Sequence, residues 1–334
     1  MPKVSVCVPS YNYAHYLGSC IKSVLDQTYE DWELVIVDNR SSDNTVEVVR
    51  SFSDARIRFH QNDTNIGLVK NWNRCVSLAT GDYVSILPAD DAYLPRMLER
   101  SVAMLDEDPK LGFTYSSYHV IDEEGRVSET KHQGNRDRIM NGEAAVRSNL
   151  IYANFAIPVT VVMRRECFHA AGGFDGAYRI IIDWVLYVRA ALRSGAGYIA
   201  EPLAVHRFQH PASVSAQTFL KRPRLITEEE RRLLDEILPL LPTDSNSREF
   251  RRLAYRGMID RHVLRTHGLL ARGDIKGFRS ELAYAMALDD TFPFRYRKMM
   301  ALWFASLFSP RLVKRLDAVE DEFWASFRGS STEP

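Results

Sequence analysis

Three short apolar segments in the first third of the chain constrain its fold more than any other feature. The segments are Val4–Val8, Leu34–Val37 and Tyr83–Leu87, and a polar loop and then a helical pattern follow each of them. Continuous apolar runs rich in β-branched residues are typical of strands that are buried on both faces of a parallel sheet. The sequence therefore predicts an α/β fold that begins with βα units.

Polar clusters stand at or just after the ends of these predicted strands and in the loop between the second and third. In an open parallel sheet, ligands bind beyond the carboxyl ends of the strands. We therefore expect the clusters to meet at one edge of the sheet and to form a ligand site. The clusters are Pro9–Asn12, Asp38–Arg40, Asn65–Gly67 and the pair Asp90 and Asp91.

The adjacent carboxylates of Asp90 and Asp91 are unusual at the end of a buried strand. Like charges this close oppose each other's ionisation, and a divalent cation between them removes the conflict. Oxygen ligands suit Mg²⁺ or Mn²⁺, and Mg²⁺ typically rests on one or two carboxylates plus substrate phosphates. The pair therefore predicts a cation-held diphosphate. The alternative is that Asp91 only caps the helix that follows.

From about residue 220 onward the sequence reads as charged, amphipathic helices interrupted by glycine and proline, with no strand-like run. With 334 residues and 46% hydrophobic content, the chain is long enough for an α/β core and a second unit. We expect a first domain over residues 1–217, with halves at 1–110 and 111–217, and a helical domain over 218–334.

One segment of the helical part, residues 294–315, combines Trp303, Phe304 and other apolar residues with six basic residues and no acid. Aromatic residues flanked by Arg and Lys suit a helix that lies in a membrane interface. The alternative is a buried helix that packs on the first domain. The first reading predicts peripheral contact with the inner face of a membrane.

Charge and cysteine usage narrow the classes of partner and compartment. Lys plus Arg equals Asp plus Glu at 43 each, so no basic field indicates a nucleic-acid partner. The four cysteines show no short CxxC spacing and are expected to be buried thiols in a reducing compartment. No leader or membrane span is evident, so we expect a cytoplasmic protein. An assembly of identical chains stays open.

Six motifs follow one another within residues 3–215. They are "VCVPSYNYAHYL", "WELVIVDNRSSDNT", "NIGLVKNWNRC", "GDYVSILPADD", "RRECFHAAGGFD" and "IIDWVLYVRAALRSG". In this order they resemble the motifs of the family 2 glycosyltransferases. This resemblance implies the GT-A fold, a Rossmann-like, mixed and mostly parallel sheet flanked by helices, here with a C-terminal α-helical extension. It also implies metal-assisted, inverting transfer of a sugar from a nucleotide-diphosphate sugar to a saccharide or lipid-linked acceptor, in surface polysaccharide or glycolipid biosynthesis.

The resemblance also implies roles for single residues. Tyr11 and Asp38 would engage the base, and Asp38 would accept from a ring N–H. Asp90 would bind the divalent metal, Mn²⁺ or Mg²⁺, and Asp91 would bind the metal or the ribose. Asp183 would be the general base. The other residues implied at the nucleotide-sugar site are Pro9, Asn12, Asn65, Gly67 and Lys70.

Several alternatives stay open at these positions. Asp183 precedes a helical pattern, so it could be an N-cap only, and Lys70 could be a solvated surface residue. His210 is the expected third metal ligand, but the spacing from Arg207 to His210 is one residue longer than in the family, so His206 or neither histidine could be the ligand.

The sequence departs from the family pattern at Pro88 and Ile182, where acids are common, and at Asn39–Arg40, where Asp-Gly is common. Two other functions therefore remain as alternatives. One is a catalytically degenerate nucleotide-sugar-binding protein. The other is a metal-dependent phosphoryl-transfer enzyme, which the lack of a glycine-rich phosphate loop disfavours.

Overall fold

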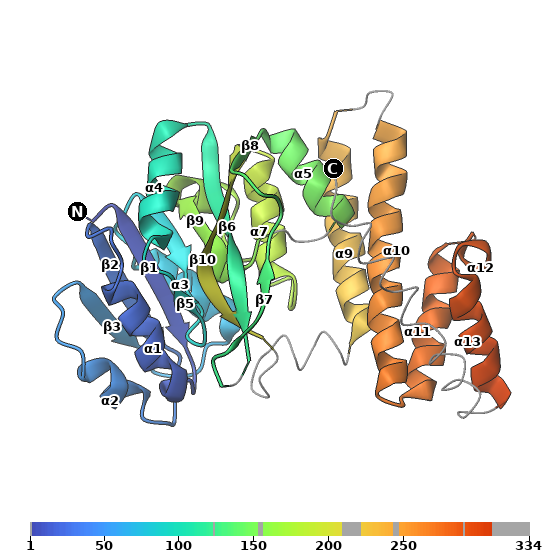
Figure 1. Ribbon diagram of the computed structural model, residues 1–334, viewed down its shortest axis with the longest axis horizontal. Helices are drawn as coiled ribbons and strands as arrows, with labels where there is room; N and C mark the ends of the chain where they lie inside the picture. Colours follow the sequence, from blue (N-terminus) through green and yellow to red (C-terminus); the bar gives the residue numbers. More distant parts are fainter. Residues whose placement is uncertain are drawn as a thin grey trace. The chain divides into compact units, whose positions relative to one another are not determined.

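The computed structural model describes residues 2–122, 124–152, 156–208, 222–242, 247–289 and 291–308. The chain forms two compact units (Figure 1). One unit contains Met1–Asn149 and Asn154–His210, and the other contains Leu150–Ala153 and Pro211–Pro334. Each unit has its own buried core.

The first unit is built on a mixed sheet that has ten strands among the described residues, in the order β3-β2-β1-β4-β9-β6-β10-β5, with β7 beside β6 and β8 beside β10. Strands β1, β2 and β4 are parallel, as the sequence predicts. Strand β3, which the sequence did not predict, runs parallel to β2, and β6 runs parallel to β10. Strand β9 is antiparallel to both β4 and β6 and joins the two parallel groups. The strands are β1 (Val4–Ser10), β2 (Trp32–Asp38), β3 (Ile57–Gln61), β4 (Tyr83–Ile86), β5 (Ala92–Tyr93), β6 (Leu111–Ile121), β7 (Val127–Lys131), β8 (Arg138–Met140), β9 (Val161–Arg164) and β10 (Gly195–Arg207).

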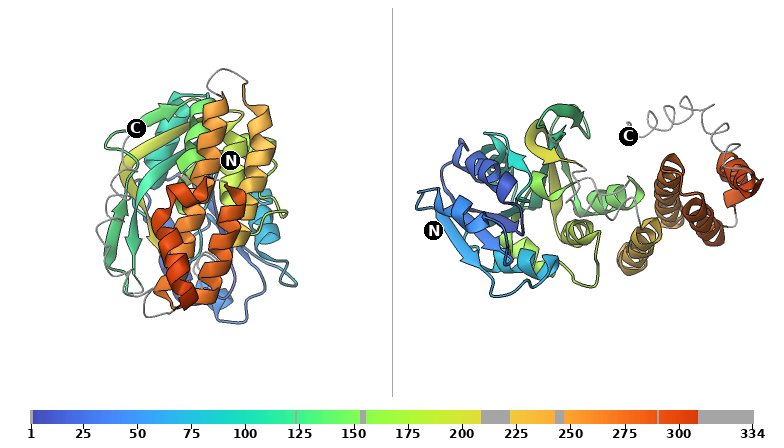
Figure 2. Two further views of the ribbon diagram at one scale, coloured as in Figure 1. Left: turned by 90° about the vertical axis from the view of Figure 1, so that its right-hand side faces the viewer. Right: turned by 90° about the horizontal axis from the view of Figure 1, so that it is seen from below.

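Helices bury both faces of the parallel part of the sheet (Figures 1 and 2). Alternate strand residues, such as Val6 and Leu34, join one core cluster with α1, α2 and α4. On the other face Cys75 of α3 contacts β2, where its thiol lies 3.2 Å from the Val35 carbonyl oxygen. This burial explains why β1 and β2 are apolar at almost every position. The helices and 3₁₀ turn of this unit are α1 (Ala14–Leu25), α2 (Thr45–Arg50), α3 (Leu68–Ser77), α4 (Met97–Glu107), η1 (Pro158–Thr160), α6 (Arg165–Ala170) and α7 (Ile182–Ala191), and α5 (Gly142–Tyr152) ends in the second unit.

The second unit is helical throughout its described residues. Its core contains a buried ion cluster, in which Glu230, 1% exposed, accepts from Arg261 at 2.8 Å and also pairs with Arg265. The helix α13 packs on α11 and α12. The elements are α9 (Pro223–Ile237), η2 (Leu238–Leu240), α10 (Ser247–Ala271), α11 (Ile275–Leu288), α12 (Phe292–Arg295) and α13 (Arg297–Phe308).

The four cysteines are free and buried, as expected. Among the described residues, no helix combines the length and the apolar character that crossing a bilayer requires.

Candidate functional site

The carboxyl ends of β1 and β2 are joined by hydrogen bonds. The amide of Asn39 donates to the carbonyl oxygen of Ser10 at 2.8 Å. The amide of Asn12 donates to the Ser41 hydroxyl at 2.8 Å, and the amide of Ser42 donates back to Asn12 Oδ1 at 2.8 Å. The first two polar clusters therefore form one edge, as the strand order predicts. Pro9 is buried in β1 beneath this edge, whereas the Tyr11 ring at its surface is 44% exposed.

Asp38 lies at the end of β2 with its side chain fully buried. Its carboxylate accepts from the Ser41 amide at 3.2 Å, from the Ser41 hydroxyl and from Gln61 Nε2 at 2.8 Å. These bonds fix the turn that follows β2. They also engage both oxygens that were expected to accept from a base.

A chain of buried amides holds the loop before α3 against β2. Asn39 Oδ1 accepts from the Ile66 amide at 2.9 Å and from Asn62 Nδ2 at 2.9 Å, and Asn39 Nδ2 donates to Asn65 Oδ1 at 2.8 Å. Asn62 Nδ2 also donates to Asn71 Oδ1 at 2.8 Å. The third polar cluster is thus attached to the first two.

The helix α3 begins after Gly67, whose φ of 83° is in the left-handed region that favours glycine. Lys70 of α3 is exposed, and its ammonium forms no hydrogen bond or ion pair with any residue in the described ranges. Its expected contact with phosphates stays a prediction.

The fourth cluster lies beside the start of α1. The pKa of Tyr13 is raised, first by burial and then by the charges of Asp90 and Asp91. The same carboxylates, after burial, raise the pKa of the Cys20 thiol, which lies 3.7 Å from the Pro88 carbonyl oxygen. Tyr13 therefore links the "PSYNY" turn to the aspartate pair.

Asp91 is buried, with only 3% of its side chain exposed. Its Oδ1 lies 3.1 Å from His206 Nδ1 and accepts from the Arg207 amide at 2.9 Å. The Arg207 guanidinium lies 4.6 Å from the centre of the Tyr16 ring. The end of β10 thus completes this corner, and Asp90 is the more exposed carboxylate of the pair.

The pKa values of Asp91 and His206 are both raised. Burial raises the pKa of Asp91, and the His206 charge opposes this rise. Burial alone would lower the pKa of His206, but the Asp91 carboxylate outweighs it and raises the pKa. A protonated His206 therefore fits next to an ionised Asp91.

Two alternatives from the sequence are wrong. Asp91 does not cap the helix that follows, because α4 begins at Met97 and Arg96 occupies the cap position. Asp183 is not the N-cap of α7 either, because Ile181 occupies that position and Asp183 lies inside the first turn. An acid in the first turn is favoured by the helix dipole without being the cap.

The charges of Asp183 and Asp91 act on two buried tyrosines. The Asp183 charge, after burial, raises the pKa of Tyr187 one turn further along α7, and Tyr93 contributes as well. The pKa of Tyr93 is raised by burial and, among other groups, by the Asp91 charge. Both phenols therefore stay protonated at neutral pH.

The donor atoms at this corner fit a hard divalent cation. Asp90 and Asp91 supply carboxylate oxygens, which Mg²⁺ and Mn²⁺ prefer. Within the described ranges, no group of three or more His, Cys, Asp or Glu side chains gathers that could hold a metal by itself. His210 lies outside the described residues. A cation here would therefore depend on oxygens from a bound diphosphate.

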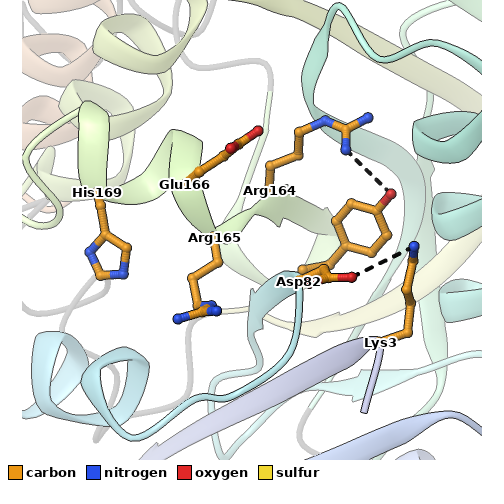
Figure 3. Close-up of a pocket in the computed structure, with 7 residues that line it drawn as sticks. Lys3, Asp82, Arg164, Arg165, Glu166 and His169 are labelled. Carbon is orange, nitrogen blue, oxygen red and sulfur yellow. Dashed lines mark hydrogen bonds and ion pairs between the residues drawn. The ribbon is translucent and has the colours of Figure 1, made fainter. Parts of the chain in front are cut away.

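A separate pocket of about 430 Å³ lies at the opposite, amino-terminal end of the strands (Figure 3). Arg164 in this pocket donates to the carbonyl oxygens of Leu105 in α4 and Leu111 in β6, at 2.6 and 2.8 Å. Lys3 lies 3.3 Å from Asp106. The side chains of this pocket thus attach α4 to the sheet, and none of the residues that line it belongs to the polar clusters.

Sequence reasoning left the roles of His206, Arg207 and Tyr13 undecided or unseen. His206 and Arg207 lie about 115 residues from Asp91 in sequence. Only the pairing of β10 with β5 and β6 brings them to this edge. The sequence offered His206 only as an alternative to His210, and the structure places it inside β10.

Comparison with known proteins places the chain in one family. The model described as glycosyl transferase family 2 matches residues 5–171, which covers the aspartate pair and ends before Asp183 and His206. An uncharacterized protein of Mycobacterium tuberculosis is 28% identical over 258 residues, which are 74% of this chain and 79% of that protein. The Escherichia coli UDP-Glc:alpha-D-GlcNAc-diphosphoundecaprenol beta-1,3-glucosyltransferase WfgD is 36% identical over 126 residues, 38% of this chain and 49% of its own.

The fold is similar to that of a solved structure. S. aureus TarS 1-349, in complex with UDP-GlcNAc, superposes with a TM-score of 0.67 at 18% sequence identity. The superposition covers 95% of this chain and 90% of that one. The similarity supports a GT-A fold with C-terminal helices.

Proposed function

This chain belongs to glycosyl transferase family 2 and is therefore a glycosyltransferase, and from that premise we propose how it acts. It takes a sugar from a nucleotide-diphosphate sugar and passes it, with inversion, to the hydroxyl of a saccharide or lipid-linked acceptor. A divalent cation, Mn²⁺ or Mg²⁺, assists. The product belongs to surface polysaccharide or glycolipid synthesis in the cytoplasm.

One observation carries this proposal: the aspartate pair, Tyr13 and His206 lie at the edge that also holds the ends of β1 and β2. A nucleoside bound along that edge would direct its diphosphate toward Asp90. Tyr11 supports the base, while Pro9, Asn12, Asn65 and Gly67 shape the site. Lys70, which is exposed at the start of α3, approaches the phosphates.

The aspartates divide the work at the diphosphate. A bound divalent cation neutralises the charge that grows on the leaving diphosphate. Asp90, the more exposed of the two, would hold the cation, and the buried Asp91 would hold the cation or the ribose. His206 supports Asp91 at 3.1 Å, and His210 stays the proposed third ligand of the cation.

Asp183 acts on the acceptor. Its place in the first turn of α7, one turn before the buried Tyr187, supports this role. It takes the proton of the incoming hydroxyl on the face of the sugar opposite the leaving group. A positioned base of this kind contributes roughly 10²- to 10⁴-fold to the rate.

Replacing Asp183 by Asn tests the assignment of the base. We expect turnover to fall roughly 10²- to 10⁴-fold, while the affinity for the donor changes little, because the amide keeps the shape of the side chain. Calorimetric titration of the donor and release of nucleoside diphosphate are the measurements. Glu166→Gln, an exposed acid at the opposite edge of the sheet, is the matched control. Unchanged turnover in Asp183→Asn would remove this residue as the base.

A panel of nucleotide sugars, screened by thermal shift with and without Mn²⁺, tests the donor class. A ligand that binds the folded state raises the melting temperature by mass action. We expect the Mn²⁺-dependent part of the shift to be lost in Asp90→Asn. Binding without turnover against varied acceptors would instead indicate a degenerate, non-catalytic relative.

We also propose that α13 contacts the inner face of the membrane, which would bring the enzyme to a lipid-linked acceptor. Phe304 and Leu307 are 53% and 44% exposed on this helix, while Leu302 is buried. Residues 309–315 of the basic segment lie outside the described residues. The enzyme should float with anionic liposomes at low salt, and Phe304→Ser with Leu307→Ser should not. Leu264→Ser, 45% exposed on α10, is the control, and failure of the wild type to float would end the idea.

A further inference from the structure

Arg40 lies directly after β2, at the edge formed by the carboxyl ends of β1 and β2, which we call the nucleotide edge. It adopts a backbone conformation that arginine rarely takes. Its φ is 66°, in the left-handed region where a non-glycine residue carries strain. The other non-glycine residue with a positive φ among the described residues is Asn12, at 57°. Its strained backbone has a structural benefit, because its side chain accepts a hydrogen bond from the Ser42 amide. Asparagine also tolerates this region better than arginine. Glycine would fit the turn at Arg40 without strain, so the arginine side chain itself needs a reason.

The guanidinium of Arg40 is directed to the outside of the protein. The residue is exposed, and it forms no hydrogen bond or ion pair within the described part of the chain. It therefore contributes nothing to the local fold that would offset the strain. Strain that persists without a structural benefit indicates a function at that position.

The side-chain oxygens of Asp38, Asn39 and Asn65, near Arg40, are already engaged. Both oxygens of Asp38 accept bonds from Ser41 and Gln61. Asn39 Oδ1 accepts two bonds, one of them from the Ile66 amide, which can only donate. Asn65 Oδ1 likewise accepts from the Gly67 amide at 2.9 Å. These backbone partners fix the orientation of both amides, so neither can turn an oxygen toward a ligand.

The planar fork of Arg40 can distinguish the bases at this edge. Uracil and thymine hold their two carbonyl oxygens apart, on either side of an N–H, so one fork cannot bridge them. Guanine instead presents two neighbouring acceptors, O6 and N7, and the arginine fork matches this pair. Adenine has a donor amino group beside N7 and does not match.

We propose that Arg40 is a specificity-determining residue that selects guanine, so that the donor is a GDP-sugar. This inference rests on the proposed function, because it concerns the base of the same donor. Tyr11, with its ring 44% exposed at the same edge, supplies a face for stacking.

Calorimetric titration with GDP, UDP, dTDP and ADP in the presence of Mg²⁺ tests the proposal. We expect GDP to bind roughly 5- to 150-fold more tightly than UDP, the range that one bidentate arginine–guanine contact gives. Arg40→Gly should abolish this preference. The melting temperature of ligand-free Arg40→Gly should not fall, because glycine relieves the strained φ.

Two further variants separate the fork from its charge. Arg40→Lys keeps the charge but loses the planar fork, so the GDP preference should largely disappear. Arg50→Ala, an exposed arginine on α2, removes one charge and should leave the preference intact.

The outcomes distinguish the two claims. If no nucleoside diphosphate binds, the proposed function fails and this inference falls with it. If UDP binds as tightly as GDP, or if Arg40→Gly keeps the GDP preference, the selection of guanine by Arg40 is wrong while the glycosyltransferase assignment stands.

Discussion

At the scale of single residues, the amides of the nucleotide edge show how a polar core can have one arrangement only. Asn71 Nδ2 donates to the Val37 carbonyl oxygen at 3.2 Å, and a carbonyl can only accept. The Ile66 and Gly67 amides fix Asn39 and Asn65 in the same way. Asn62 lies between them and donates to both sides. The orientation of each side-chain amide in this hydrogen-bonded series is therefore set, directly or through its neighbour, by a backbone group.

Replacing Asn62 by Asp should break this chain with almost no change of shape. A carboxylate cannot donate, so it faces the oxygens of Asn39 and Asn71 without a hydrogen bond. We expect a loss of about 1–3 kcal/mol in the free energy of unfolding, measured by urea denaturation. The affinity for the donor should fall as well, because the 62–67 loop loses its attachment.

Asn44→Asp is the control for this substitution. Asn44 is exposed at the cap position of α2 and makes no side-chain cap bond. The same chemical change there should leave stability nearly unchanged. Equal losses in both variants would show that the buried amide chain is not what stabilises the edge.

At the scale of elements, the helical unit depends on one buried carboxylate. Glu230 of α9 faces two arginines of α10, Arg261 and Arg265, and burial lowers the pKa of Arg265. Glu230→Gln would leave two cations in the interior without a counter-charge. We expect a loss of about 3–5 kcal/mol from the helical unit, measured by calorimetry.

Glu249→Gln, an exposed pair with Arg252 at 3.9 Å, is the matched control and should change stability by less than about 1 kcal/mol. If Glu230→Gln changed stability as little as the control, the buried cluster would not hold α9 to α10.

The sequence could predict some elements of the fold and not others for a physical reason. Strands β1, β2 and β4 are buried on both faces and appear as apolar runs, so they were predicted. Strand β3 reads "IRFHQ" and is only half-buried at the sheet edge, so no apolar run marks it. The mixed half of the sheet came only from the family resemblance.

The same limit applies to the site. The order of polar clusters along the chain predicted which loops meet at the edge, because parallel strands end together. The partner of Asp91 was not predictable from spacing, because the pairing of β10 with β6 shifts register near Pro202 before it reaches His206. A single sequence carries no record of such shifts.

At the scale of the whole molecule, the two units should respond differently to acid. Burial lowers the pKa of His262 in α10 to about 4. Its Nε2 donates to the Glu281 carbonyl oxygen at 3.0 Å, which fits the neutral ring. Because the unfolded chain binds the proton first, the helical unit is fully stable above about pH 6.5 and loses stability as the pH falls toward 4.

Glu33 makes the stability of the α/β unit depend on pH in a more acidic range. Burial alone would raise its pKa, but hydrogen bonds from Ser5, Arg58 and Thr80 outweigh burial and lower it to about 2. The stability from this group is present above about pH 4.5 and is lost as the pH falls toward 2.

Calorimetry between pH 7 and 4.5 should therefore show the helical transition moving to lower temperature, whereas Glu33 adds no pH dependence to the α/β transition in this range. His262→Asn should flatten this dependence, and Glu33→Gln should not. A single transition with the same acid dependence in both variants would contradict the separation.

The path of the backbone has a consequence for engineering. Leu150–Ala153 belongs with the helices although both flanking stretches belong with the sheet, and Arg261 donates to the Ile151 carbonyl oxygen at 2.8 Å. A stop codon after His210 would remove the helices with which Leu150–Ala153 is grouped and would expose Leu150 to water. The C-terminal helices therefore cannot be deleted without affecting the first unit. A chain truncated after His210 should aggregate rather than give a shorter active enzyme.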